Sequence, residues 1–234
     1  MYQKQTVTKV VNNLRDAVKT YREKIDREGV AAVRLTISRG NVKIGRVMNV
    51  SLAPILTCAN CSGCMGYCYD VKACNQYPNT VIDARARNTA IMQADRNEYF
   101  RRIDDAISRR RTNKFFRWHV AGDIVDVDYL ARMVDIARAH PDFVFWTYTK
   151  NYKAVNEYCK RRGGRSAIPG NLSIMFSEWR GMPMINPYHF PEFSVVFKDD
   201  EHKPAGHYCP GNCDVCKATR RGCIAGETTY CNEH

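Results

Sequence analysis

The stretch from residue 115 to residue 149, FFRWHVAGDIVDVDYLARMVDIARAHPDFVFWTYT, decides the expected fold. It begins with an apolar run at 115–122 that suits a strand, continues with helical spacing at 127–140, and ends in a second strand run at 143–149. The alternation then goes on with an expected helix at 151–162 and expected strands at 171–179 and 193–198. Strands that alternate with helices at this spacing predict an α/β fold with mainly parallel strands and a sheet covered on both faces.

Upstream of this stretch, apolar residues at three- and four-residue steps predict an N-terminal helix that stops at Gly29. These apolar residues are Val7, Val10, Val11, Leu14, Val18 and Ile25. Two extended runs, 31–38 and 43–53, flank Arg39-Gly40-Asn41 and indicate a hairpin. After Pro78, helical spacing that continues as far as Ile107 predicts one long helix.

The eleven cysteines of the 234-residue chain are strongly grouped. Four lie in a C-x2-C-x2-C-x3-C run and five in a second run near the C-terminus, which begins C-x3-C-x2-C. The nine are Cys58, Cys61, Cys64 and Cys68, then Cys209, Cys213, Cys216, Cys223 and Cys231. Short spacings of this kind let several sulfurs converge on one metal centre. We therefore take all nine as candidate metal ligands, and Cys74 and Cys159 as buried small side chains without chemistry.

The spacing of the first run is that of ferredoxin-type iron–sulfur proteins, whereas structural zinc usually takes two separated C-x2-C pairs. Thiolates suit both metals, but triplet spacing and crowding favour [4Fe-4S] clusters, with zinc as the alternative and disulfides third. We expect two clusters. The first lies at 58–68 in an α/β domain of residues 1–206, and the second in a cysteine-rich C-terminal metal-binding appendage of residues 207–234, which has few helix or strand signals.

Polar residues follow the ends of several expected strands, where ligands bind in parallel α/β proteins. His119 and Asp123 end one strand, Lys150 follows the next, and Glu178 the one after. The simpler interpretation is a core histidine, a helix cap and two ordinary strand-end charges. Because these residues and the first cysteine run come at the same edge, we take His119, Asp123 and Lys150 as catalytic candidates.

The strand, cysteine loop and following Gly-Asp resemble the partial (β/α) barrel of radical S-adenosylmethionine enzymes. In that family three cysteines after the first strand hold a [4Fe-4S] cluster, whose open iron binds S-adenosylmethionine. The resemblance implies that Ala121-Gly122-Asp123 takes the place of a segment that contacts the amino group of the cofactor, which makes Gly122 and Asp123 cofactor-binding candidates. The C-x3-C-x2-C spacing of that family occurs here only at Cys209, Cys213 and Cys216.

From about Lys43 onward the chain more closely resembles the phage-encoded "gene product eighty-eight" domain proteins. The similarity rests on 51–58, on Cys64-x3-Cys68-Tyr69 with Lys72, on 116–123 and 145–150, and on Cys209-Pro210 with the later C-x2-C. It implies a viral or mobile-element protein with cysteine-bound metal, whose ligands are Cys58, Cys64 and Cys68 in preference to Cys61.

Composition limits the partners. With 36 Lys and Arg against 24 Asp and Glu, the formal net charge is +12. This charge permits sequence-nonspecific binding of nucleic acid. Much of the arginine-rich segment 96–117, however, alternates with acidic residues. No apolar run is long enough to span a membrane, and the N-terminus has no secretory pattern. We therefore expect a cytoplasmic protein, in the host cytoplasm if phage-encoded.

Two functions fit this sequence. The first is an iron–sulfur protein that serves redox or radical chemistry with an electron donor or a small-molecule ligand, enzymatic or not. The alternative is a non-enzymatic protein in which zinc staples a nucleic-acid-binding or host-interaction module.

Overall fold

The computed structural model describes residues 4–42 and 44–233. Residues 1–3, Lys43 in the expected strand and His234 in the expected C-terminal segment therefore lie outside the described residues. The chain forms two compact units, which we call the helical unit and the sheet unit. The helical unit comprises Met1–Ile37, Val50–Arg111 and His119–Asp123, and the sheet unit comprises Ser38–Asn49, Thr112–Trp118 and Ile124–His234.

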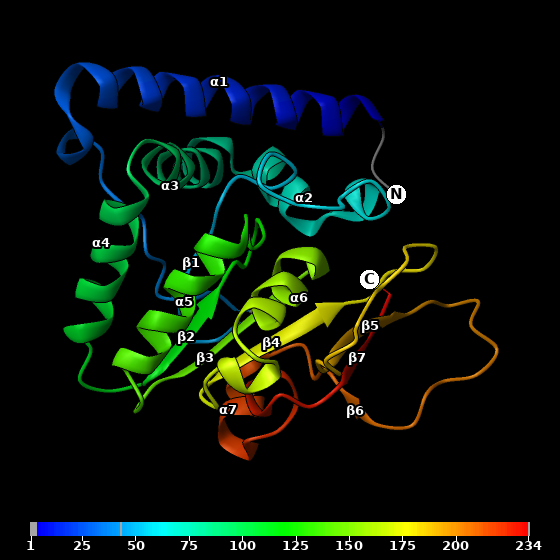
Figure 1. The fold of residues 1–234 in the computed structure, drawn as a ribbon. Coiled ribbons are helices and arrows are strands. Elements are labelled where there is room, and N and C mark those ends of the chain that lie inside the picture. Colours follow the sequence, from blue (N-terminus) through cyan, green and yellow to red (C-terminus); the bar gives the residue numbers. More distant parts are fainter. Residues whose placement is uncertain (1–3, 43, 234) are drawn as a thin grey trace. The chain divides into compact units, whose positions relative to one another are not determined.

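The helical unit contains the expected N-terminal helix. Its helices are α1 (Lys4–Glu28), α2 (Tyr69–Gln76), a π-helical turn (Pro78–Ile82), α3 (Asp83–Ala94) and α4 (Arg96–Ser108). Helix α1 buries the apolar stripe that includes Leu14, which is fully buried, and packs along α3 (Figure 1). The helix ends before Gly29, whose φ of 84° a residue with a side chain rarely adopts.

The single long helix expected after Pro78 is wrong, because the chain breaks at Asp95. Asp95 has extended backbone angles (φ −146°, ψ 92°), and its carboxylate accepts a hydrogen bond from the Glu98 amide at 2.9 Å. Aspartate is a strong N-cap because its side chain satisfies an amide that the helix leaves without a partner. The apolar spacing therefore continues across two helices, α3 and α4, rather than one.

The sheet unit confirms the α/β class. Its strands are β1 (Met48–Val50), β2 (Phe115–Trp118), β3 (Val144–Thr149), β4 (Leu172–Ser177), β5 (Glu192–Val196), β6 (His207–Tyr208) and β7 (Thr229–Asn232). They form one seven-stranded sheet in the order β1-β2-β3-β4-β5-β7-β6, and all pairs from β2 to β6 are parallel. Helices α5 (Val127–Ala139) and α6 (Tyr152–Arg161) connect β2 to β3 and β3 to β4.

The two faces of the sheet are covered by different parts of the chain. Helices α5 and α6 lie on the same side of the strands (Figure 1). The ring of Tyr152 in α6 packs on the ring of Phe176 in β4, with 5.0 Å between the two ring centres. Consecutive side chains of a strand point to opposite faces of the sheet, so the residues next to Phe176 face away from α6. Trp146 of β3 and Met175 of β4 accordingly pack in a second buried cluster with Ile224 from the C-terminal segment.

The C-terminal segment is more regular than its sequence indicates. It contains α7 (Cys213–Thr219) and a 3-10 turn (Gly222–Ala225), and β7 inserts between β5 and β6. The segment thus completes the sheet. The expected hairpin is reduced to two isolated antiparallel bridges, Ser38 with Asn49 and Asn41 with Gly45.

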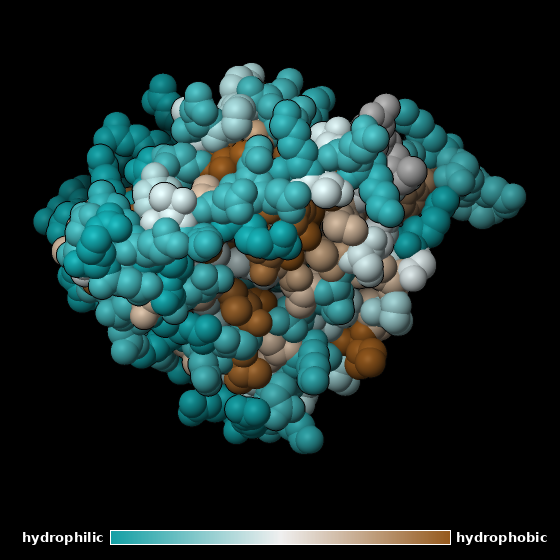
Figure 2. Space-filling view, turned by 90° about the horizontal axis from the view of Figure 1, so that it is seen from above, coloured by the Kyte–Doolittle hydropathy of each residue, from teal (hydrophilic) through white to brown (hydrophobic). Residues whose placement is uncertain are grey.

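Within the described part of the chain, no helix is both long and apolar enough to cross a membrane. Hydrophilic side chains dominate the face seen in Figure 2, and hydrophobic side chains are confined to small patches between them. Many of the basic side chains have acidic neighbours. On α4, for example, Arg101 pairs with Glu98 and Asp105.

Candidate functional site

In the helical unit, the segment that leads into the first cysteine run lies beside the segment that contains His119 and Asp123. The His119 amide donates to the Val50 carbonyl at 3.0 Å, and the Leu52 amide donates to the Ala121 carbonyl at 3.0 Å. Ser51 fixes the same register, because its hydroxyl accepts a hydrogen bond from the Ala121 amide at 3.2 Å. Two segments that are about seventy residues apart in the sequence are therefore held side by side by hydrogen bonds.

The His119–Asp123 segment is buried and has an unusual backbone. His119 and Asp123 are 3% and 4% exposed. His119 has a φ of 52°, and Gly122 has a φ of 85°. A Cβ on Gly122 would lie 2.8 Å from the Leu52 Cβ and 2.9 Å from the Thr57 hydroxyl. A buried non-glycine residue in the left-handed region is a strained conformation of the kind that clusters at functional sites.

We call Cys58, Cys61, Cys64 and Cys68 the N-terminal thiol loop. All four side chains are partly exposed. Burial raises the pKa of Cys58, with further increases from the charges of Asp123, Cys68 and Cys61. Burial also raises the pKa of Cys61, and the charges of Cys64 and Asp123 raise it further. The thiols and the Asp123 carboxylate are therefore close enough to act on one another electrostatically.

Cys68 joins this group from the start of α2. Burial raises its pKa, and the charges of Asp70 and Cys64 add to the increase. Cys74 also lies in α2, but it is fully buried, with its Sγ 3.9 Å from Asp70 Oδ2. Burial, followed by the charge of Asp70, raises the pKa of Cys74 to about 12, as befits a core side chain.

The second run of cysteines lies in the sheet unit, and we call it the C-terminal thiol group. Its members are Cys209, Cys213, Cys216, Cys223 and Cys231. Burial raises the pKa of Cys216 to about 11, with further increases from Cys213, Cys223 and Cys209. Burial, then the charges of Cys209 and Cys223, raises the pKa of Cys231 to about 11. All five sulfurs therefore belong to one electrostatically coupled group.

Side chains of β2 and β3 face this group from the sheet. Burial raises the pKa of Cys223 and of Cys213, whereas the Tyr148 hydroxyl lowers the pKa of Cys223 and the charge of Arg117 lowers that of Cys213. The Arg117 guanidinium carbon lies 4.7 Å from the centre of the Tyr148 ring. Burial, followed by the charge of Cys223, raises the pKa of Tyr148. The C-terminal thiol group therefore has a cation and a hydroxyl among its neighbours.

The C-terminal thiol group also has a histidine and an indole nearby. His207 Nε2 lies 4.0 Å from Cys216 Sγ. Trp146 packs in the same buried cluster as Cys216 and Cys223, and no described residue accepts a hydrogen bond from its Nε1. Buried indole N–H groups usually have an acceptor, so this donor is an exception among buried groups.

The remaining sequence candidates lie in the sheet unit. Lys150 Nζ donates to the Ser177 hydroxyl at 2.7 Å and lies 5.9 Å from the centre of the Trp179 ring. Glu178 accepts a hydrogen bond from the Ser194 hydroxyl. Cys159 is fully buried in α6, away from both thiol groups in the sequence. The catalytic roles of His119, Asp123 and Lys150 stay predictions.

Over residues 4–42 and 44–233, no three side chains of His, Cys, Asp or Glu adopt an arrangement ready to hold a metal ion. The thiol groups are therefore sets of neighbouring donors rather than closed coordination spheres. Their metals, like the ligand roles of the nine cysteines, stay predictions.

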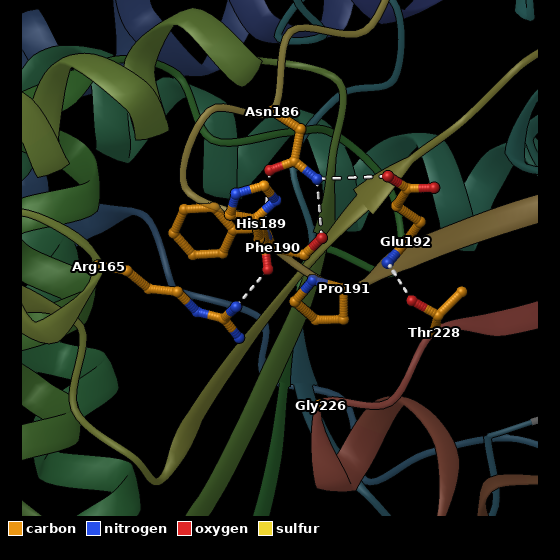
Figure 3. Close-up of a pocket in the computed structure, with 8 residues that line it drawn as sticks. All are labelled: Arg165, Asn186, His189, Phe190, Pro191, Glu192, Gly226 and Thr228. Atoms are coloured by element: carbon orange, nitrogen blue, oxygen red, sulfur yellow. Dashed lines mark hydrogen bonds between the residues drawn. The ribbon is translucent and has the colours of Figure 1, made fainter.

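A cavity of about 350 Å³ opens elsewhere in the sheet unit (Figure 3). Its polar groups are paired with one another: Arg165 donates to the His189 carbonyl, and Asn186 Nδ2 donates to Glu192 Oε1 at 3.3 Å. The Glu192 amide donates to the Thr228 hydroxyl at 3.2 Å. These bonds fix the entry to β5, and the cavity offers fewer chemically distinctive groups than the thiol sites.

Four residues at the C-terminal thiol group, namely Arg117, Trp146, Tyr148 and His207, are not among the sequence candidates. The signal available for Trp146 and Tyr148 is their alternation on one face of the 143–149 strand. Nothing in the sequence indicates that the C-terminal segment folds back over that face.

Comparisons with known proteins add one match. A family model described as "Gene product 88" matches residues 16–225. No curated protein and no solved structure matches the chain.

Proposed function

The chain belongs to the Gene product 88 family, a phage protein family, and we propose that it is an iron–sulfur protein with two [4Fe-4S]-type clusters. The N-terminal thiol loop would hold one and the C-terminal thiol group the other. The observation that carries this proposal is the presence, in each compact unit, of a separate set of neighbouring cysteines, none of them in a disulfide. Thiolates this close repel one another, and a bound cationic core offsets that repulsion.

The donor chemistry of both groups fits a cluster. Sulfur is the dominant donor, and the five thiols of the C-terminal thiol group are enough for the four ligands that a [4Fe-4S] cluster takes. Arg117 and Tyr148, which act on Cys213 and Cys223, would supply the hydrogen bonds to sulfur that are typical of iron–sulfur sites. The unpartnered indole N–H of Trp146, in the same cluster of side chains, adds a further donor.

A bound cluster would supply one-electron transfer or, with an open iron, binding of a small molecule. The chain's own residues shape the surroundings. The close approach of Gly122 to Leu52 and Thr57 fixes the backbone that precedes Asp123. Asp123 would then present a buried carboxylate beside Cys58, suited to the amino group of S-adenosylmethionine in the radical version of this proposal. The radical version of the proposal includes a partial (β/α) barrel. The sheet supports it, because strands β1 to β5 lie side by side in the same order as in the sequence.

Zinc is the second candidate, and one observation favours it. His207 Nε2 lies 4.0 Å from Cys216 Sγ, so a mixed cysteine and histidine site can be assembled in the C-terminal thiol group. In that case the metal would staple the end of the chain onto the sheet, and the net charge of +12 would serve nonspecific binding of nucleic acid or a host protein.

The test is metal and sulfide analysis of the full chain purified without air. The iron–sulfur proposal expects brown protein with iron and acid-labile sulfide in equal amounts. Colourless protein with stoichiometric zinc and no sulfide supports the second candidate and rejects the first.

The radical version of the proposal is tested on the reduced, iron-loaded protein, which should cleave S-adenosylmethionine to 5′-deoxyadenosine. If no cleavage occurs, electron transfer in the host cytoplasm is the proposed role that stands.

A further inference from the structure

The cavity in the sheet unit has opposite charges on two of its sides. Arg165 lies at one side and Glu192 at the other, with the ring of Pro191 between them (Figure 3). Arg165 is exposed and begins the 3-10 turn Arg165–Ala167, which precedes β4, whereas Glu192 is half-buried and begins β5. A ligand that fills the cavity therefore meets a cation on one side and a carboxylate on the other.

The Arg165 guanidinium is held in place without being neutralised. Its Nη1 donates to the His189 carbonyl, and its central carbon lies 5.1 Å from the centre of the Phe190 ring. The Phe190 ring is itself stacked on Phe176, with 4.9 Å between the ring centres. No described carboxylate pairs with Arg165, and no described residue accepts a hydrogen bond from its Nε or Nη2. These two N–H groups form a fork that binds a phosphate or carboxylate through two hydrogen bonds.

The Glu192 carboxylate keeps one oxygen for a ligand. Asn186 Nδ2 donates to Glu192 Oε1 at 3.3 Å, and no described residue donates to Oε2. The Asn186 side chain is fixed in turn, because it forms hydrogen bonds of 2.8 Å with both the amide and the carbonyl of Phe190. Asn186 therefore positions a carboxylate that can accept from an amino group but repels a phosphate.

His189 adds a flat surface to the lining of the cavity. The residue is exposed, and no described residue forms a hydrogen bond or a ring contact with its imidazole. Its backbone has a φ of 54°, which is uncommon for a residue with a side chain and is found more often at functional sites. Histidine is one of the side chains on which unpaired nucleic-acid bases stack.

The positive charge continues beyond the cavity. The run KRRGGR at 160–165 leads from α6 into the 3-10 turn. Within it Arg161 is paired with Glu157 at 2.8 Å. Lys160 and Arg162 are exposed and form no ion pair with a described carboxylate. A small zwitterion would leave these charges unused, whereas a polyanion can contact them together with the cavity.

We propose that this cavity binds one nucleotide of a single-stranded nucleic acid. One phosphate takes the fork of Arg165, and neighbouring phosphates lie along the run 160–165. The base enters the cavity, where its exocyclic amino group donates to Glu192. Cytosine presents such an amino group, from which Glu and Asp side chains accept, and thymine presents a carbonyl oxygen in its place. The cavity therefore prefers cytosine to thymine.

A duplex is a poorer partner for the same site, because a base must leave the stack before it enters a cavity. The volume of about 350 Å³ lies in the range of sites for small ligands. None of the eight described residues that line the cavity is a cysteine. The inference therefore goes beyond the proposed function and does not depend on the metal that the thiol groups hold.

The experiment measures binding of the full chain to fluorescein-labelled oligo(dC) and oligo(dT) of about twelve nucleotides by fluorescence anisotropy. The salt concentration is varied from about 50 to about 200 mM, because phosphate contacts weaken as salt rises. We expect oligo(dC) to bind about tenfold more tightly than oligo(dT).

Variants assign the effect to the named residues. Glu192→Gln should remove the preference for oligo(dC) while binding of oligo(dT) remains, since an amide donates as well as accepts. Arg165→Gln should weaken binding of both strands by about tenfold at about 50 mM salt and reduce the salt slope by about 0.7. Arg162→Gln should act in the same direction, and it removes no hydrogen bond, ion pair or ring contact to a described side chain. Arg101→Gln is the matched control, because Arg101 is already paired with two carboxylates, and it should leave binding unchanged.

Two results would overturn the inference. One is equal affinity for oligo(dC) and oligo(dT), or a preference that Glu192→Gln retains. The other is a loss in Arg101→Gln as large as that in Arg165→Gln and Arg162→Gln, which would mean that any cation of the chain contributes. Iron, sulfide and zinc are measured on the same samples, so failure of this inference and failure of the proposed function are seen separately.

Discussion

The Asp70 carboxylate forms a two-point ion pair with Arg85, in which Nε donates to Oδ2 at 3.1 Å and Nη2 donates to Oδ1 at 3.0 Å. The pair joins α2 to α3, and Asp70 lies only two residues after Cys68. The side chains are 2% and 15% exposed. This pair therefore anchors the end of the N-terminal thiol loop to the helices behind it.

Removing one partner of this pair should be costly. Arg85→Leu leaves a buried carboxylate without its cation, and we expect a loss of about 3–5 kcal/mol in the free energy of unfolding. The double variant Asp70→Leu/Arg85→Leu removes both charges and should be more stable than the single variant. Urea unfolding measures these two variants and the single variant Asp70→Leu. A double variant that loses the sum of the two single losses would show that the pair contributes no coupling.

Gly122 should be intolerant of a side chain. Gly122→Ala places a Cβ 2.8 Å from the Leu52 Cβ at a φ of 85°. Gly163→Ala is the matched control, because Gly163 has a φ of 84° and no atom within 4 Å of the added Cβ. The control should lose about 1 kcal/mol from backbone strain alone. Gly122→Ala should lose about 1–3 kcal/mol more from overpacking, measured by urea unfolding. Equal losses would mean that the close approach to Leu52 is relieved without cost.

The two cysteines outside the thiol groups should be dispensable for metal. Cys74 and Cys159 are fully buried, and Cys74 lies beside Asp70 rather than among the other thiols. The double variant Cys74→Ala/Cys159→Ala should retain the iron and sulfide content of the unaltered chain. A loss of half the iron would assign one of them to a site.

His207 separates the two proposed metals. In the iron–sulfur account five thiols are available in the C-terminal thiol group, so His207→Ala should leave the iron content unchanged. A mixed zinc site that uses His207 would lose about one metal ion per chain in this variant. Cys216→Ser serves as the control in both accounts, because it removes a thiol at the centre of the group. Metal analysis of the three proteins decides between them.

The fold between residues 115 and 198 follows from the sequence because its signals are local. Strand runs and helical spacing alternate there. Strands β2 to β4 and helices α5 and α6 lie within the expected ranges, and β5 (Glu192–Val196) overlaps the strand expected at 193–198. The break at Asp95 escapes a reading of apolar spacing, since a cap acts through one side chain and leaves the spacing intact. The strands β6 and β7 have two and four residues, too few for a periodic signal, and form by pairing with each other and with β5.

Part of the candidate sites can likewise be predicted from the sequence, and part cannot. Close spacing alone indicates that the cysteines form two groups, and the rule on strand ends indicates that Asp123 lies near Cys58. The partners of the C-terminal thiol group cannot be found from sequence. Arg117 and Tyr148 meet Cys213 and Cys223 only because a segment more than sixty residues away folds over the opposite face of the sheet from α6.

The most direct test of the central claim is an iron and sulfide count in the unaltered chain and in two full-length variants, each designed to retain one site. In one variant serine replaces Cys213, Cys216 and Cys223, and in the other serine replaces Cys58, Cys64 and Cys68. The unaltered chain should contain about eight iron and eight sulfide ions, and each variant about four of each. Retention of half the count in both variants would show that the two thiol groups hold separate clusters. An unaltered chain that contains zinc and no sulfide, or a full count lost in both variants, would contradict the account.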